Sequence, residues 1–108
     1  LRPPRRVTPT YDQARQLGKA YVGALNTGAD AFRRLFAPGA RLVVGGALAE
    51  DPAVLFTVTP PGRSGFRRAR LEPPHVCFTI RVRDRESARD LVHRVTVDEA
   101  GRIASVEA

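Results

Sequence analysis

The sequence predicts an α+β fold in which two N-terminal helices pack on one face of a curved, cone-shaped antiparallel sheet. Apolar residues recur at helical spacing in the first third of the chain, and after Gly39 they alternate in short segments separated by turn residues. The length of 108 residues fits a single domain. We therefore expect a flexible basic arm over residues 1–8 and one folded domain over residues 9–108.

The first helix is predicted over about Pro9–Asn26. Thr8 could cap it with Pro9 as its first residue, or Thr10 and Gln13 could form a capping box. One face of this helix is apolar and contains Ala14, Leu17, Gly18, Tyr21, Val22 and Leu25. A second helix is predicted over about Ala29–Ala37, ended by Pro38 and Gly39.

The remaining segments are predicted strands, and their alternation assigns side chains to the two faces of the sheet. In Val76–Arg83, for example, Phe78 points to one face and Cys77 to the other. In Asp90–Val97, His93 shares a face with Leu91, Val95 and Val97. The other expected strands are Arg41–Val44 (continuing through a glycine bend to Ala49), Ala53–Thr59, Phe66–Glu72 and Arg102–Glu107, the last preceded by a hairpin turn over Asp98–Gly101.

Composition narrows the class of protein. The net charge is +7, and arginine supplies all but one, Lys19, of the 18 basic residues. Such arginine usage is typical of a GC-rich genome, so we expect a bacterial source. A single cysteine, Cys77, excludes an intramolecular disulfide and a multi-cysteine zinc site. No apolar run is long enough to span a membrane. We expect no metal and no cofactor, and the cytoplasm is the working assumption for location.

Two stretches resemble a known superfamily. Residues 20–44, AYVGALNTGADAFRRLFAPGARLVV, and residues 94–106, RVTVDEAGRIASV, are similar to the opening and closing segments of nuclear-transport-factor-2-like (NTF2-like) proteins. That group includes the ketosteroid isomerases and the SnoaL-like polyketide cyclases. The resemblance implies a cystatin-like roll whose cone encloses an apolar pocket. Only the region around Glu50–Leu55 is available for the superfamily's third helix, so we expect an abbreviated member that lacks most of it.

The resemblance also implies positions for the isomerase site. In those enzymes a tyrosine and a protonated acid hold the substrate oxygen, and a carboxylate moves the proton. The tyrosine position falls at Tyr21 and the acid position at His93. The base position falls at Val44, or within one residue of it at Val43 or Gly45, and none of these can accept a proton. Glu50 and Asp51 are the candidates for a replacement base. The expected ligand-binding residues are Tyr21, Phe36, Val44, Phe56, Phe78 and His93.

Each of these candidates also has a structural explanation. Tyr21 could be a core aromatic, His93 a hydrogen-bonded core histidine, and Glu50 and Asp51 a solvated turn before Pro52.

Arginines are expected on the opposite face of the sheet. There they could bind phosphates, or pair with acidic residues across the two-fold axis of a homodimer. The expected anion-binding set is Arg67, Arg68, Arg70, Arg81, Arg83 and Arg94.

Three functions are therefore open. The first is a non-catalytic or accessory domain that binds an apolar small molecule or a protein partner through its cone or sheet face. The second is an isomerase or cyclase that uses Tyr21 and His93. The third is nucleic-acid binding through the arginines, which the shortage of stacking aromatics weakens.

Overall fold

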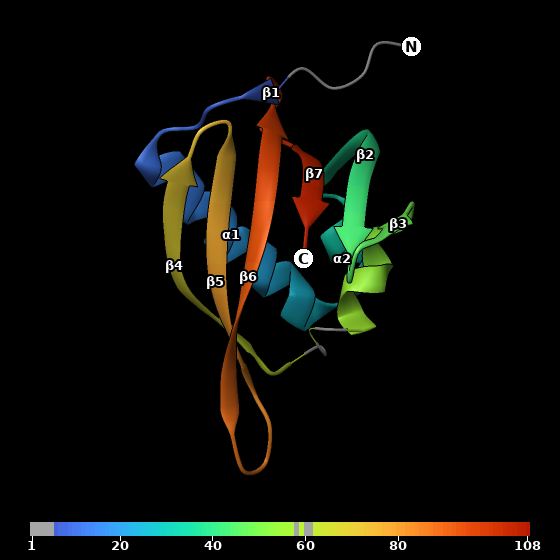
Figure 1. Cartoon of the computed structure of the whole chain (residues 1–108), viewed down its shortest axis with the longest axis vertical. Helices are drawn as coiled ribbons and strands as arrows, with labels where there is room; N and C mark the ends of the chain where they lie inside the picture. The colour runs from blue at the N-terminus through green and yellow to red at the C-terminus, as the bar shows by residue number, and fades with distance from the viewer. Residues whose placement is uncertain (1–5, 58, 60–61) are drawn as a thin grey trace.

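A mixed sheet with helices on one of its faces forms the molecule (Figure 1). The structure, a computed structural model, describes residues 6–57, 59 and 62–108. Its helical elements are α1 (Tyr11–Thr27), α2 (Ala29–Arg33) and the 3-10 helix η1 (Pro52–Thr57). Its strands are β1 (Arg6–Val7), β2 (Phe36–Val44), β3 (Ala47–Ala49), β4 (Ser64–Glu72), β5 (His75–Arg83), β6 (Ala88–Asp98) and β7 (Ile103–Glu107).

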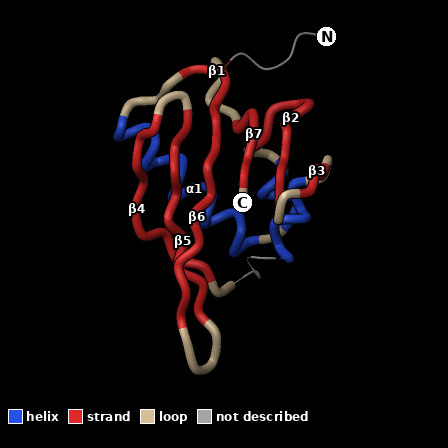
Figure 2. The backbone as a smooth tube through the Cα atoms, in the orientation of Figure 1, coloured by secondary structure: helices blue, strands red, loops and turns tan. Residues whose placement is uncertain are grey.

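The strands lie in the order β3-β2-β7-β6-β5-β4, and β1 pairs with the end of β6. All pairs are antiparallel except β2 with β7, which is parallel, so the expected all-antiparallel sheet is wrong at this one pair. The α+β class, the two N-terminal helices and the curved sheet are confirmed. Figure 2 shows the β5–β6 hairpin extending beyond the other strands.

The start of α1 follows the capping-box prediction. The Thr10 hydroxyl accepts a hydrogen bond from the Gln13 backbone N–H at 3.2 Å, and the Gln13 side chain accepts one from the Thr10 N–H at 2.9 Å. The alternative cap at Thr8 is wrong, because the helix begins at Tyr11 rather than Pro9. Helix α1 ends at Thr27, one residue beyond the expected Asn26, and is followed by Gly28, whose φ of 144° few other residues adopt.

Helix α2 is shorter than predicted. It ends at Arg33, and Phe36, expected in the helix, begins β2. Phe36 pairs with Ile103 of β7, and the Ile103 N–H donates to the Leu35 carbonyl at 2.8 Å. Pairing with β7, which comes from the far end of the chain, therefore places this segment in the sheet. Pro38 also prevents the helix from continuing.

The predicted strand over Ala53–Thr59 is also wrong, because most of this segment forms η1. The Asp51 carboxylate accepts the Ala53 N–H at 3.0 Å and is itself held by two Arg33 N–H groups, both at 2.9 Å. This carboxylate caps the short helix, which occupies the place expected for a reduced third helix. Val58 lies outside the described residues.

The N-terminal arm was expected to have no regular structure over residues 1–8. Residues 1–5 lie outside the described part of the chain. Arg6 and Val7, however, form β1, which pairs with Asp98 and Val97 of β6. The pairing places this short strand beside the end of β6, beyond the point where β5 begins.

The core lies between the helices and the inner face of the sheet. Helix α1 crosses behind β4, β5 and β6 in Figure 1. Gly18 permits a close approach at this contact, because a Cβ there would lie 2.4 Å from the Phe66 ring of β4. The largest fully buried side chains include Tyr21, Phe32, Phe78, Leu25, Leu42, Leu55, Ile80, Ile103 and His93.

Candidate functional site

The two residues placed by the resemblance meet inside the core. The Tyr21 hydroxyl of α1 and Nδ1 of His93 on β6 lie 2.7 Å apart and share a hydrogen bond. Tyr21 is 0% exposed and His93 1% exposed. The prediction that His93 faces inward is confirmed, since it pairs across the sheet with the buried Phe78. The sequence therefore located the pair, but its hydroxyl and imidazole bind each other and are closed to solvent.

Aromatic rings fill the space around this pair. The Tyr21 ring centroid lies 5.0 Å from that of Phe32 and 5.4 Å from that of Phe78. Phe32 in turn contacts Phe36 at 5.0 Å and Phe56 at 5.6 Å. The residues expected to line a ligand pocket thus pack against one another as core. Val44 is half-buried against the same cluster.

Burial sets the protonation states of the pair. It lowers the pKa of His93 to about 4 and raises the pKa of Tyr21 well above its usual range. At neutral pH the imidazole is uncharged and the phenol keeps its proton. The phenol O–H can then donate to Nδ1 when that nitrogen is unprotonated. The arrangement satisfies two polar groups inside an apolar core.

The two acidic candidates for the base lie away from this pair, on the exposed surface. Arg33 holds the Asp51 carboxylate and, together with the Ala53 N–H, lowers the pKa of Asp51 to about 2. Asp51 is therefore a helix cap and an ion-pair partner. Glu50 lines an open hollow of about 620 Å³ with Phe36, Arg33 and Pro52, at the end of the sheet where β2 begins.

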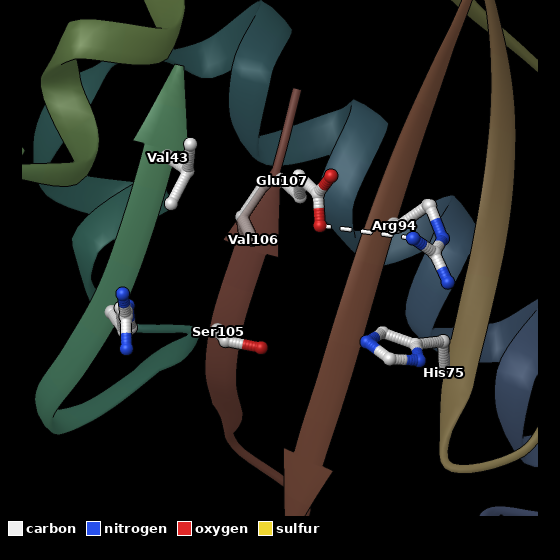
Figure 3. Close-up of a pocket in the computed structure, with 7 residues that line it drawn as sticks. Val43, His75, Arg94, Ser105, Val106 and Glu107 are labelled. Carbon is white, nitrogen blue, oxygen red and sulfur yellow. Dashed lines mark ion pairs between the residues drawn. The ribbon is translucent and has the colours of Figure 1, made fainter. Parts of the chain in front are cut away.

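The outer face of the sheet carries a smaller, polar hollow of about 200 Å³ (Figure 3). Arg94 of β6 and Glu107 of β7 point toward each other across it, with 3.7 Å between Nη1 and Oε2. His75 of β5 lies beside Arg94. The lining is completed by Arg41, Val43, Ser105 and Val106. A hollow of this size is below the usual range for small-molecule pockets.

Strand pairing explains why these residues share one face. Successive cross-strand pairs join Leu48 to Val43, Val43 to Glu107, Glu107 to Arg94 and Arg94 to Cys77. The row therefore runs across the outer face and mixes apolar side chains with both signs of charge.

Two exposed apolar side chains of the sheet lie on this outer face. Leu48 is 69% exposed at one end of the row, and Val92 is 53% exposed two residues before Arg94 on β6. The third large exposed apolar residue among those described, Tyr11, is 51% exposed and lies at the start of α1. The outer face therefore displays both apolar and charged groups to solvent.

The six predicted anion-binding arginines divide into two groups. Three form ion pairs: Arg70 with Glu72 at 2.8 Å, Arg81 with Asp90 at 3.0 Å, and Arg94 with Glu107. The others, Arg67, Arg68 and Arg83, are exposed on β4 and β5. The charge available to an anion is thus smaller than the arginine count suggests.

Cys77 lies on the outer face, as its position in the β5 alternation predicts. Its thiol donates to the Glu72 carboxylate at 2.9 Å, and burial together with that carboxylate raises the pKa of the thiol. A raised thiol pKa disfavours the reactive thiolate.

Sequence reasoning missed the hollow in Figure 3. His75 was not among the predicted site residues, and it is half-buried in a strand with neighbours on both sides. Arg41 and Ser105 become neighbours only through the parallel β2–β7 pair. Alternation within each strand was the available signal for the face, but the pairing of those strands is not encoded locally.

The comparisons with known proteins describe the fold. Neither the family models nor the curated proteins searched match this chain. Among solved structures, the chain superposes on a de novo designed NTF2-fold protein with a TM-score of 0.67 and 17% identity, covering 94% of this chain and 87% of that one. The chain has the NTF2-like fold. The resemblance noted in the sequence is therefore confirmed at the level of fold.

Natural proteins match equally well. A candidate polyketide cyclase from Sinorhizobium meliloti matches at a TM-score of 0.64 and 21% identity, over 85% of this chain and 92% of that one. A candidate ketosteroid isomerase from Kribbella flavida matches at 0.64 and 18% identity, over 90% and 76% respectively. Designed and natural proteins match alike at these low identities, so the likeness transfers fold and no activity.

Neither a metal-binding cluster nor a membrane-spanning helix is present in the described residues. Within residues 6–57, 59 and 62–108, the acidic, histidine and cysteine side chains form no group of three that could hold a metal ion. In the same part of the chain, no helix has the length and hydropathy that a membrane crossing requires.

Proposed function

We propose that this chain is a non-catalytic, NTF2-like accessory domain that binds protein through the outer face of its sheet, and that its first occupant is a second copy of the chain. The supporting observation is the position of the exposed apolar residues Leu48 and Val92, which flank the charged hollow on that face. Exposed apolar side chains among charged ones are typical of protein interfaces.

Charge complementarity favours a second copy as the occupant. In a two-fold contact, a residue away from the axis meets a different residue of the other copy, so the surface must complement itself. Arg94 and Glu107 supply opposite charges within one row, and Arg81 with Asp90 supplies a second such pair. A face of one sign would repel its own copy.

The interior gives less support to the enzymatic alternative. An isomerase or cyclase needs Tyr21 and His93 within reach of a substrate, whereas here the two side chains are buried and bonded to each other. The same burial argues against binding of an apolar small molecule in the cone. Both alternatives would require rings such as Phe32 and Phe78 to move aside.

Oligomeric state tests the proposal. Sedimentation velocity on the whole chain at increasing concentration should give a dimer, and Val92→Arg should shift the species to monomer. Tyr11→Arg is the matched control, because it places the same charge on a similarly exposed apolar residue outside the sheet face. Circular dichroism checks that both variants keep the fold. A wild-type chain that stays monomeric, or a dimer lost in Tyr11→Arg but kept in Val92→Arg, overturns the proposal.

A further inference from the structure

A second surface carries a different kind of site. A hollow of about 510 Å³ lies where β4 begins and β5 ends, beside the base of the protruding hairpin in Figure 1. Four arginines line it, Arg63, Arg67, Arg81 and Arg83, and its lining contains no acidic residue. The other lining residues are Gly62, Ser64, Gly65 and Phe66.

Strand pairing creates both the space and the charge. Gly65 lies opposite Arg81 in the β4–β5 pair and contributes no side chain to the face from which Arg81 projects. The Arg83 N–H donates to the Arg63 carbonyl at 2.9 Å, which fixes these two arginines side by side along the backbone. A second hollow, of about 400 Å³, shares Arg63 and Arg83 and adds Arg89 together with the acidic Asp84.

Asn26 positions the loop that forms one wall. Its side-chain oxygen accepts the backbone N–H groups of Gly62 at 3.0 Å and Ser64 at 3.1 Å, and its amide nitrogen donates to the Ser64 carbonyl at 2.7 Å. These three bonds tie residues 62–64 to the last turn of α1. The wall is therefore held in place before any ligand binds, which lowers the ordering cost of binding.

The arginines leave excess positive charge in this hollow. Only Arg81 among the four has an ion-pair partner in the described residues, the carboxylate of Asp90 at 3.0 Å. That carboxylate also interacts with Arg67 and Arg68, and the three arginines together lower the pKa of Asp90, Arg81 most. One carboxylate thus serves several guanidinium groups, and Arg63 and Arg83 have no ion-pair partner within the described residues.

The hydroxyl of Ser64, a lining residue that pairs with the buried Val82 on the inner side of the sheet, lacks a partner among the described residues. Ser64 Oγ is buried and makes no hydrogen bond within the described part of the chain. A buried polar atom without a partner is uncommon in proteins and costs free energy unless something satisfies it. Ser64 also contributes its backbone to the Asn26 clamp, so its place in the wall is fixed.

We propose that this hollow binds a small, multiply charged phosphate compound, with Arg63, Arg67 and Arg83 as its cationic ligands. Guanidinium groups suit phosphate oxygens because they donate paired N–H bonds in a planar fork. The volume lies within the range of small-molecule sites. Arg81 lines this hollow and also belongs to the proposed dimer face through its pair with Asp90, but the three proposed ligands, Arg63, Arg67 and Arg83, are not used in the dimer proposal.

The small compound is favoured over a nucleic acid. Three of the six arginines expected to form a basic stripe are neutralised by Glu72, Asp90 and Glu107. A polymer needs charge spread along its length and, when single-stranded, aromatic side chains for its bases to stack on. Of the three arginines of that stripe without an ion pair in the described residues, Arg67 and Arg83 line one concave place.

Calorimetric titration with inorganic tripolyphosphate tests the site. The wild-type chain should bind tripolyphosphate more tightly than orthophosphate, and Arg63→Gln with Arg83→Gln should weaken tripolyphosphate by about tenfold or more. The matched control is Arg15→Gln with Arg34→Gln, which lowers the net charge equally, from +7 to +5, at exposed positions on other elements. The control should change affinity less than about twofold.

Three results overturn the proposal. The first is no measurable binding of tripolyphosphate. The second is equal weakening in both double variants, which would assign binding to net charge alone. The third is an oligonucleotide that binds more tightly than tripolyphosphate with a steep salt dependence, which would assign the arginines to a polymer. Thermal unfolding of both variants checks that the fold is retained.

Discussion

The two faces of the sheet use polar groups in opposite ways. On the inner face, Tyr21 and His93 satisfy each other inside a shell of rings and carry no net charge. On the outer face, charged groups such as Arg94 and Glu107 lie open to solvent around a hollow. The comparison teaches that residues at positions resembling an enzyme's active site can act as core, while the charged side chains that remain open to solvent lie on the other side of the same strands.

The largest expected effect comes from substitutions at two residues of β5, one on each face of the sheet. Phe78→Ala on the inner face should lower the free energy of unfolding by about 3–5 kcal/mol, because it removes a fully buried ring from the aromatic cluster. Arg81→Ala on the outer face should cost less than about 1 kcal/mol, since it breaks a partly exposed ion pair.

Urea denaturation measures both changes. Phe78→Leu serves as the milder variant if Phe78→Ala does not fold. Similar losses for the inner-face and outer-face substitutions would contradict the division between a closed face and an open one.

The buried pair should make stability depend on pH. The unfolded chain protonates His93 near its ordinary pKa of about 6.5, whereas the folded chain does so only near 4. Between these values the unfolded state holds the extra proton, so stability falls as the pH falls. The total loss should be about 3 kcal/mol.

Denaturation curves at several pH values between 7 and 4 (about one per half unit) would measure this loss. The double variant Tyr21→Phe with His93→Leu removes the titrating group, so its stability should change less over the same window. Equal pH dependence in both proteins would mean that His93 is accessible to protons, and would reopen the interior as a functional site.

The smallest expected effect tests how closely α1 packs on the inner face. Alanine normally stabilises a helix by about 1 kcal/mol relative to glycine. Gly23→Ala should show that gain, because nothing lies within 4 Å of its added Cβ. Gly18→Ala should instead destabilise, because its Cβ would lie 2.4 Å from the Phe66 ring and overpacking costs about 1–3 kcal/mol.

Thermal or urea unfolding of the two alanine variants gives the comparison directly. Stabilisation by both would show that the Phe66 ring moves aside at little cost. The helix would then lie less tightly on β4 than the structure indicates.

Local patterns predicted the faces of individual strands but not their partners. Alternation in β5 correctly placed Phe78 inside and Cys77 outside, and the same reasoning turned His93 inward. It could not predict that Phe36 leaves the helix, because that depends on pairing with Ile103 far along the chain. Periodicity alone does not show whether a short apolar run such as Ala53–Thr59 forms a strand or a helix. Here the Asp51 carboxylate caps the segment, which favours the helix.

The candidate site shows the same limit. The resemblance to NTF2-like proteins implied the positions of Tyr21 and His93, and strand alternation turned His93 inward. The same alternation would occur in an open cone and in a filled one, so it could not tell them apart. Phe32 decides the outcome, because its ring contacts those of Tyr21, Phe36 and Phe56 at once. Such a three-way contact depends on how α2, β2 and η1 come together.

The position of β7 has a consequence for how the chain is made. This five-residue strand lies between β2 and β6, so it joins the segment near the helices to the β4–β6 meander. A ribosome adds β7 after all the other strands, and the nascent chain must keep two unpaired strand edges until residues 103–107 emerge. Completion of the fold therefore waits for the last strand, and a chaperone that shields those edges during synthesis should increase the yield of folded protein.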